Sequence, residues 1–229
     1  MRTALKNLIV LSASSILAVW CCGCHDHERL VNSDSIVGSG NIVAETRTPG
    51  TFSGIRVTGM AKVFISQDTV ESLRIEADDN IIDLVTTSVD QDVLLIGLRD
   101  GSYSDITVNV YATMRSVALI EFTGSGSCVT TSPIQSDDIT CRITGTGTIA
   151  LSGTAIRQTI VIAGAGNVQN FGLVSAQCSA SILGTGNIEV NVTQQLDAII
   201  AGVGTITYEG NPSVVHQTTT GVGSIQLRQ

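Results

Sequence analysis

The 229-residue sequence predicts an all-β protein, a single-domain parallel β-helix with repeats of about 20 residues. Three observations carry this prediction. A Gly-x-Gly motif recurs along the chain, and apolar and polar residues alternate on both sides of it. Gly is abundant with 23 residues whereas aromatic residues make up only 3%, so the core must be built from small and branched aliphatic side chains.

The repeats are clearest in the second half of the chain, where the first glycines of successive motifs are 21, 19, 20, 18 and 19 residues apart. An earlier copy stands at Gly38/Gly40, and Gly59 with Ala61 is a degenerate one. A unit of this length cannot close a core alone, so successive units must stack. The six regular copies are Gly124/Gly126, Gly145/Gly147, Gly164/Gly166, Gly184/Gly186, Gly202/Gly204 and Gly221/Gly223.

The residues that flank each motif follow the two-residue period of a strand with one buried face. The residue after the second Gly is short and hydrogen-bonding: Asn41, Ser127, Thr148, Asn167, Asn187, Thr205 and Ser224. The residue after that is apolar: Ile42, Cys128, Ile149, Val168, Ile188, Ile206 and Ile225. Each repeat is therefore predicted to be a strand, a Gly-x-Gly corner, a second strand and a turn.

Glycine at the corner has two expected reasons. Stacked coils approach closely there, and glycine adopts positive φ without the steric cost of a Cβ. The Asn, Ser or Thr beside it is expected to hydrogen-bond the local backbone at the bend.

Residues 43–115 are less regular. Their strand-like runs include 55–57, 63–65 and 106–110. We interpret them as wider first coils of the same solenoid, with a separate small β-sandwich as the alternative. The segment 80–85 fits either a short helix or a strand.

The N-terminus has the features of an export signal. Arg2 and Lys6 precede an apolar run over 8–20, which is too short to span a bilayer. The following Cys21-Cys22-Gly23-Cys24 resembles the lipobox of bacterial lipoproteins, in which a small residue precedes the lipidated cysteine. Residues 1–23 are therefore predicted to be a lipoprotein signal peptide and Cys24 the site of lipid attachment, with Cys22 as the alternative. A soluble secreted protein is the other interpretation.

Residues 24–35 are polar and without periodicity, and are predicted to be a flexible tether to a domain over 36–229. His25 stands where enteric lipoproteins retained in the inner membrane carry Asp, so an outer-membrane location is expected. Arg2 and Lys6 are two of 12 basic residues, so the mature chain would keep ten against 20 acidic ones, a net charge of −10. Such a surface repels nucleic acid and polyanions.

The residue types that support catalysis or metal binding are scarce. Two tether residues, His25 and His27, are too few for an organised zinc site, so no metal and no cofactor is expected. The densest acidic group is interpreted as a solvated turn; it comprises Glu76, Asp78, Asp79 and Asp83. After the tether the one histidine is His216, and no catalytic residue is assigned. The apolar strand positions also hold Cys128, Cys141 and Cys178, expected to be small buried side chains, with a 128–141 disulfide as the alternative.

Several segments resemble a known family in their order along the chain. They are 37–43, 52–57, 63–67 and 73–84, followed by the repeated Gly-x-Gly strands. Together, over about 36–229, they resemble the auto-transporter adhesin head GIN domain. The resemblance implies a right-handed β-helix in bacterial envelope or surface proteins, and it transfers no catalytic or ligand-binding residue to this chain.

Two functions from different classes are consistent with these observations. The favoured one is a non-catalytic cell-envelope lipoprotein that acts through its surface in adhesion, scaffolding or polymer binding. The alternative is a glycan-processing enzyme of the lyase or hydrolase type, since parallel β-helices host such activities. The expected partners are the membrane through the N-terminal lipid, a glycan or envelope polymer, and a second copy through the end of the solenoid, but not nucleic acid.

Overall fold

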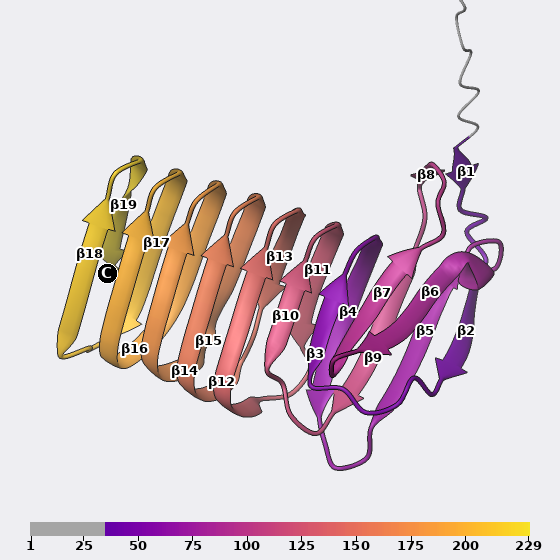
Figure 1. The fold of residues 1–229 in the computed structure, drawn as a ribbon, viewed down its shortest axis with the longest axis horizontal. Coiled ribbons are helices and arrows are strands. Elements are labelled where there is room, and N and C mark those ends of the chain that lie inside the picture. Colours follow the sequence, from indigo (N-terminus) through magenta and orange to yellow (C-terminus); the bar gives the residue numbers. More distant parts are fainter. Residues whose placement is uncertain (1–34) are drawn as a thin grey trace, which may run out of the picture. The chain divides into compact units, whose positions relative to one another are not determined.

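A computed structural model describes residues 35–229, which form an elongated β-solenoid (Figure 1). The coils wind in a right-handed sense, and each contributes one strand to each of two faces. Face A consists of β3 (Gly54–Val57), β10 (Leu119–Phe122), β12 (Ile134–Ile143), β14 (Gly153–Ile162), the second halves of β15 (Ala165–Ile182) and β16 (Thr185–Ile200), and β18 (Val214–Thr219). Face B consists of β4 (Met60–Gln67), β11 (Ser125–Thr130), β13 (Thr146–Ala150), the first halves of β15 and β16, β17 (Val203–Gly210) and β19 (Val222–Leu227). Neighbouring coils pair in parallel on both faces, which confirms the predicted fold class.

The Gly-x-Gly motifs stack in register at the corner between face A and face B. The amide of Thr146 donates to the carbonyl of Gly124 at 2.9 Å, and the amide of Ala165 donates to that of Gly145 at the same distance. The degenerate copy is confirmed, because Met60 pairs with Ser125 and Ala61 with Gly126.

The interior is a single column of aliphatic side chains that alternate with outward residues, as the two-residue period predicts. Strands of face A bury Phe122, Ile143, Ile162, Ile182 and Ile200 beside the corner. Strands of face B bury Cys128, Ile149, Val168, Ile188 and Ile206 opposite them. The core is therefore mainly aliphatic, with Phe122 and Phe52 as its buried aromatic side chains.

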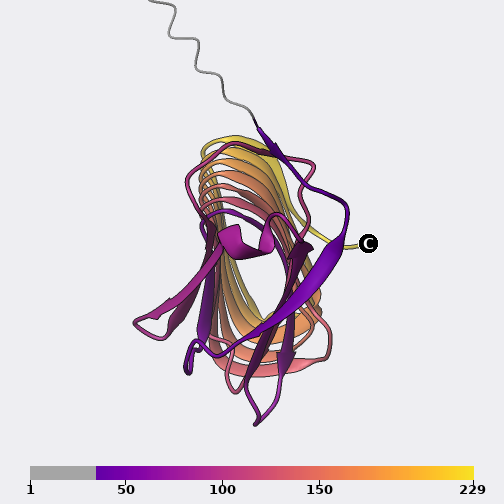
Figure 2. The ribbon, with the colours of Figure 1, turned by 90° about the vertical axis from the view of Figure 1, so that its right-hand side faces the viewer.

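The structure confirms the expectation for residues 43–115 only in part. Only β3 and β4 form a regular coil, while β7 (Val93–Leu98) extends face A and β9 (Val108–Met114) extends face B. Antiparallel strands then complete this end: β5 (Ser72–Asp78) on β9, β2 (Ile42–Arg47) on β5, and β6 (Val85–Asp90) on β7. The 3-10 turn η1 (Ile82–Leu84) lies across the end of the stack (Figure 2). The interpretation as coils of the same solenoid is therefore confirmed for β3/β4 and β7/β9, whereas β2, β5 and β6 are antiparallel additions and no separate sandwich forms.

The copy at Gly38/Gly40 is not a corner of the stack, which corrects the sequence interpretation. It connects β2 to β1 (Ile36–Val37), which pairs with β8 (Tyr103–Ser104). The buried carboxylate of Asp78 accepts hydrogen bonds from the amides of Gly40 and Thr107, both at 2.7 Å. A Cβ on Gly38 would lie 2.7 Å from Asp78 Oδ2. Gly38 therefore makes room for a carboxylate rather than for a neighbouring coil, whereas Gly40 has a positive φ of 78° and open space around it.

The three cysteines of the described residues are buried, as expected from their strand positions. Burial raises the pKa of the Cys128 and Cys178 thiols far above the usual range, and that of Cys141 to about 12. A thiolate is the species that attacks in disulfide formation, so these thiols should react very slowly. We expect mass spectrometry of the folded, non-reduced and alkylated protein to show no bridge between Cys128 and Cys141; detection of one would contradict this expectation.

The last described coil, β18 and β19, has no further strand against it within residues 35–229. Its inward positions are more open than those of other coils, since Gln217 and Thr219 are exposed and Val215 and Ile225 are only partly buried. Association of two copies through this end stays a prediction.

The signal peptide 1–23, the lipidation site Cys24, the alternative Cys22 and most of the tether 24–35 lie outside the described residues. Among the described residues, no helix has the length and apolar character that a membrane span requires.

Candidate binding face and corner cleft

A column of short polar side chains runs along the outside of face B, next to the corners. Parallel pairing places the residues after each second Gly of the stack in register from coil to coil. Neighbouring strands lie about 4.8 Å apart, so the column is a regular array of hydroxyl and amide groups. We call it the polar column: Ser127, Thr148, Asn167, Asn187, Thr205 and Ser224.

The sequence predicts that these side chains hydrogen-bond the backbone at the bend of their own coil, and the structure does not bear this prediction out. Asn167 Oδ1 instead accepts from both the backbone amide and the side-chain amide of Asn187 in the next coil, each at 3.1 Å. The amide pair therefore links two coils on the surface. The outward direction of the column also leaves hydrogen-bonding groups available to a ligand.

A shallow groove of about 280 Å³ follows the polar column on the later coils. Its second wall comes from residues two positions further along each strand, namely Gln169, Glu189 and Thr207. The wall residues are neutral except for Glu189. The groove thus offers amides and hydroxyls on both sides along the solenoid axis.

Two aromatic rings continue face B toward the N-terminal end. Phe64 on β4 pairs with Tyr111 on β9, and the two rings stack with centroids 4.9 Å apart and an interplanar angle of 13°. Arg74 covers the Tyr111 ring at 5.3 Å. Tyr111 donates its hydroxyl to Glu76 at 2.9 Å, and this hydrogen bond raises the pKa of Tyr111. The pair is a fixed, half-buried aromatic platform.

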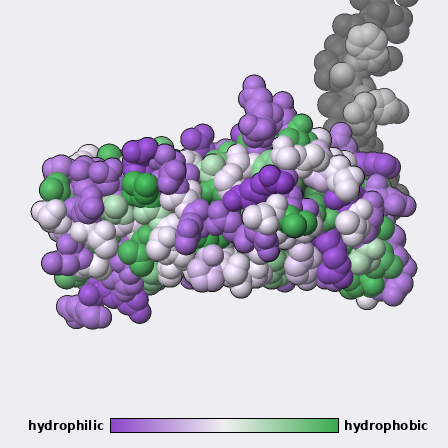
Figure 3. Space-filling model, turned by 90° about the horizontal axis from the view of Figure 1, so that it is seen from below, coloured by the Kyte–Doolittle hydropathy of each residue, from purple (hydrophilic) through white to green (hydrophobic). Residues whose placement is uncertain are grey.

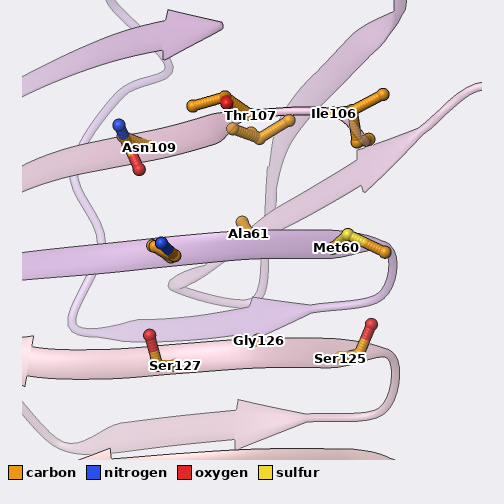
Figure 4. A pocket seen from close by; sticks show the side chains of 10 residues that line it. Met60, Ala61, Ile106, Thr107, Asn109, Ser125, Gly126 and Ser127 are labelled. Carbon is orange, nitrogen blue, oxygen red and sulfur yellow. The ribbon is translucent and has the colours of Figure 1, made fainter. Parts of the chain in front are cut away.

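A larger cleft of about 400 Å³ opens at the first corner, between β4, β9 and β11 (Figure 4). It exists because β9 pairs with β4 only from Lys62 and Asn109 onward, so Ile106 and Thr107 diverge from the corner at Met60 and Ala61. We call it the corner cleft. Its lining combines apolar with polar side chains: Met60, Ala61, Lys62, Ile106, Thr107, Val108, Asn109, Ser125, Gly126 and Ser127.

The acidic group of Glu76, Asp78, Asp79 and Asp83 has a structural role that the sequence did not indicate. Glu76 is paired with Arg74, and the carboxylate of Asp78 is buried instead of solvated. Asp79 accepts from Ser39 at 2.6 Å and Asn41 at 2.8 Å, and these hydrogen bonds lower its pKa. Only Asp83 is an exposed carboxylate without such a contact. Within residues 35–229, no group of three or more His, Cys, Asp or Glu side chains is arranged to hold a metal ion.

The structure aligns Ser179, Asp197 and His216 on neighbouring coils of face A, a combination that resembles a hydrolytic triad by residue type. Their order is wrong for that chemistry. His216 Nδ1 lies 2.6 Å from Asp197 Oδ1, whose pKa it lowers, and the strand that carries Asp197 separates the histidine from Ser179. A general base must contact the nucleophile, so these residues do not form a catalytic triad.

Sequence reasoning missed the aromatic platform and the corner cleft. Both depend on the pairing of β4 with β9, which joins residues 47 positions apart across an antiparallel insertion, as between Ser66 and Thr113. No periodic signal marks such a pairing. One feature of the sequence could have indicated this region. Phe64, Tyr111 and Lys62, which is the one lysine after residue 6, all lie outside the regular repeats.

Fold and surface together define a β-solenoid protein with a regular polar face. A family model described as "Putative auto-transporter adhesin, head GIN domain" matches residues 51–212. The chain therefore belongs to this adhesin-type family, and the family resemblance stated above is confirmed. Membership points to an extracellular or envelope-associated protein. The comparison with curated proteins finds no match.

Solved structures share the fold. A putative adhesin from Bacteroides fragilis is 24% identical with a TM-score of 0.69, and the match covers 85% of this chain and 100% of that one. A putative lipid binding protein from Parabacteroides distasonis is 20% identical with a TM-score of 0.53, covering 85% and 100%. A putative adhesin from Parabacteroides merdae is 19% identical with a TM-score of 0.51, covering 86% and 100%. At these identities the likeness concerns the fold alone.

Proposed function

We propose that this protein is a lipid-anchored envelope adhesin that holds a polar glycan along face B. The observation that carries the proposal is the register of the polar column, which repeats hydroxyl and amide groups from coil to coil. A linear polysaccharide presents its own hydroxyls at regular intervals, so one coil after another can contact it. Many weak contacts along one polymer add up through multivalency.

The composition of the surface supports a polar ligand over an apolar one. On the side seen from below (Figure 3), hydrophilic and neutral residues predominate and the hydrophobic residues form only small groups. The aromatic platform of Phe64 and Tyr111 adds a fixed, amphipathic border to face B, because the Tyr111 ring is stacked on Phe64 and covered by Arg74. The net charge of −8 disfavours polyanions, so the polymer should be neutral or nearly so.

A binding role fits face B better than glycan cleavage. Glycosidases hold two carboxylates about 5–10 Å apart across the scissile bond. On the outside of face B, Glu76 and Glu189 are separated by six strand spacings, about 29 Å at 4.8 Å each. Glu209 lies on the strand next to Glu189, but its carboxylate is bonded to Arg228 and Asn191. Glu76 is also engaged by Arg74 and Tyr111.

The test of the binding face is a pair of matched double variants. We expect Asn187→Ala/Thr205→Ala to weaken binding to immobilised neutral polysaccharides about tenfold or more, because two hydrogen bonds of about 1 kcal/mol each are lost on face B. The control is Thr159→Ala/Ser179→Ala, which removes outward hydroxyls from face A. Glycan-array binding with equal loss for both variants, or with no loss for either, would reject face B as the binding surface.

The anchor is tested separately. We expect Cys24→Ser to abolish acylation and to release the protein from membranes, because stable anchoring needs two or more acyl chains. Cys21→Ser should leave the anchor intact. Detergent partitioning with mass analysis of the N-terminal peptide measures both. Release by a Cys22 variant instead would move the attachment site, and retention of all three variants in the membrane without acylation would refute the lipoprotein proposal.

A further inference from the structure

We propose that the corner cleft binds one terminal sugar that carries both a carboxylate and an acyl group, at the end of the glycan held along face B. The inference rests on the proposed function and specifies its ligand. The cleft lies at the head of the polar column, because Ser127 both lines the cleft and begins the column, and Lys62 of the cleft pairs with Ser127. Its volume of about 400 Å³ lies at the small end of the range of ligand pockets, about 300–1,000 Å³.

Lys62 supplies the positive charge. It is the one lysine in residues 35–229, its side chain is exposed, and no carboxylate of the described residues lies within ion-pair distance of it. The strand register places Asn109 next to Lys62 and Glu76 on the far side of Asn109. Because Glu76 is already bonded to Arg74 and Tyr111, the ammonium group of Lys62 is left for an external carboxylate.

Met60, Ile106 and Val108 supply the apolar part of the cleft. Met60 is 44% exposed at the variable position of the degenerate corner, where the next coils carry Ser125, Thr146 and Ala165. Figure 4 shows Met60 and Ile106 on opposite walls at the corner end, with Asn109 and Ser127 further along the strands. An acyl methyl group fits the corner end, and the carboxylate and hydroxyls of the same sugar fit the Lys62 end.

The charge of the whole molecule limits the ligand to one acidic unit. Acidic residues outnumber basic ones by 20 to 12, and the groove beyond the cleft contains Glu189 but no cation. Repeated carboxylates along the polymer would be repelled there. A neutral chain that ends in one acidic, acylated sugar therefore fits both the corner cleft and the groove beyond it.

The experiment crosses two variants with four oligosaccharide probes that share one neutral chain. The caps are N-acetylneuraminic acid (acid and acyl), glucuronic acid (acid only), N-acetylglucosamine (acyl only) and glucose (neither). Lys62→Gln should weaken binding of the two acidic caps about tenfold and leave the neutral caps unchanged, with Lys62→Arg restoring affinity. Met60→Ser, which copies the residue at the next corner, should weaken only the acylated caps, about fourfold, the value of one buried methyl group of about 0.8 kcal/mol.

Each outcome bears on the proposal. Equal affinity of the wild-type protein for all four caps, or equal loss for acidic and neutral caps in Lys62→Gln, would overturn it. A dodecanoate probe that competes with the N-acetylneuraminic acid cap and loses affinity in Lys62→Gln would assign the cleft to an acyl chain instead. If the four caps bind with equal affinity while the shared chain still binds wild type and loses binding in Asn187→Ala/Thr205→Ala, the proposed function stands and only the assignment of the cleft falls.

Discussion

Gly184→Val is expected to destabilise the solenoid by more than about 4 kcal/mol, or to prevent folding, because the corner has no room for a side chain. A Cβ at Gly184 would lie inside the van der Waals radii of the carbonyl oxygens of Gly164 and Ala163, and 2.7 Å from the carbonyl carbon of Ala163. These are backbone atoms of the coil below, so no flexible side chain can move aside. Ser179→Val, at an exposed position of β15, should change stability by only about 0.5 kcal/mol.

Gly184→Ala separates the two explanations for glycine at this position. The φ angle of Gly184 is not in the left-handed region, so alanine imposes no backbone strain there. We nevertheless expect a loss of about 3 kcal/mol or more, because the Cβ of alanine meets the same two carbonyl oxygens as that of valine and forces the coils apart. Urea denaturation of the three variants measures these differences. If Gly184→Ala is as stable as the wild type, the close approach of the coils is not what requires glycine.

The corners show which part of the fold could be predicted from sequence. The period, the inward residues and the parallel stack follow from the Gly-x-Gly spacing and from the alternation around it, because each coil contacts only its neighbours. Of the two reasons expected for glycine at the corner, only close stacking applies to the first glycine of the motif. Close stacking excludes a Cβ at Gly184, whereas positive φ occurs at the second glycine of some corners, such as Gly126 with φ 145°.

The N-terminal end could not be predicted in the same way, because its contacts are not between consecutive segments. Gly38 and Gly40 match the repeat by sequence, yet their environment is set by Asp78, about 40 residues later. The pairing of Phe64 with Tyr111 likewise depends on an antiparallel insertion without a repeat. The candidate site is built where the repeat begins, so the periodic signal that predicts the solenoid does not extend to the cleft.

Two polar side chains in the core behave differently, and they were not recognised from sequence. Gln158 on β14 points inward between Ile139 and Cys178 of the adjacent coils, and neither its Oε1 nor its Nε2 has a hydrogen-bond partner among the described residues. Asn170 on β15 is equally buried, but its Oδ1 accepts from the backbone amide of Leu151 at 2.9 Å.

Opposite effects are therefore expected from the same kind of substitution. Gln158→Leu should stabilise the protein by about 1–3 kcal/mol, because a buried polar group without partners costs about that much. Asn170→Leu should destabilise it by about 1–3 kcal/mol, because it leaves the Leu151 amide buried and unpaired. Thermal unfolding and urea unfolding measure the change in the free energy of unfolding of each variant, and the m-values should stay unchanged. A stability loss in Gln158→Leu would mean that the amide of Gln158 has partners in solution, such as a buried water molecule, since the flanking Ile139 and Cys178 side chains already provide an apolar surface for leucine.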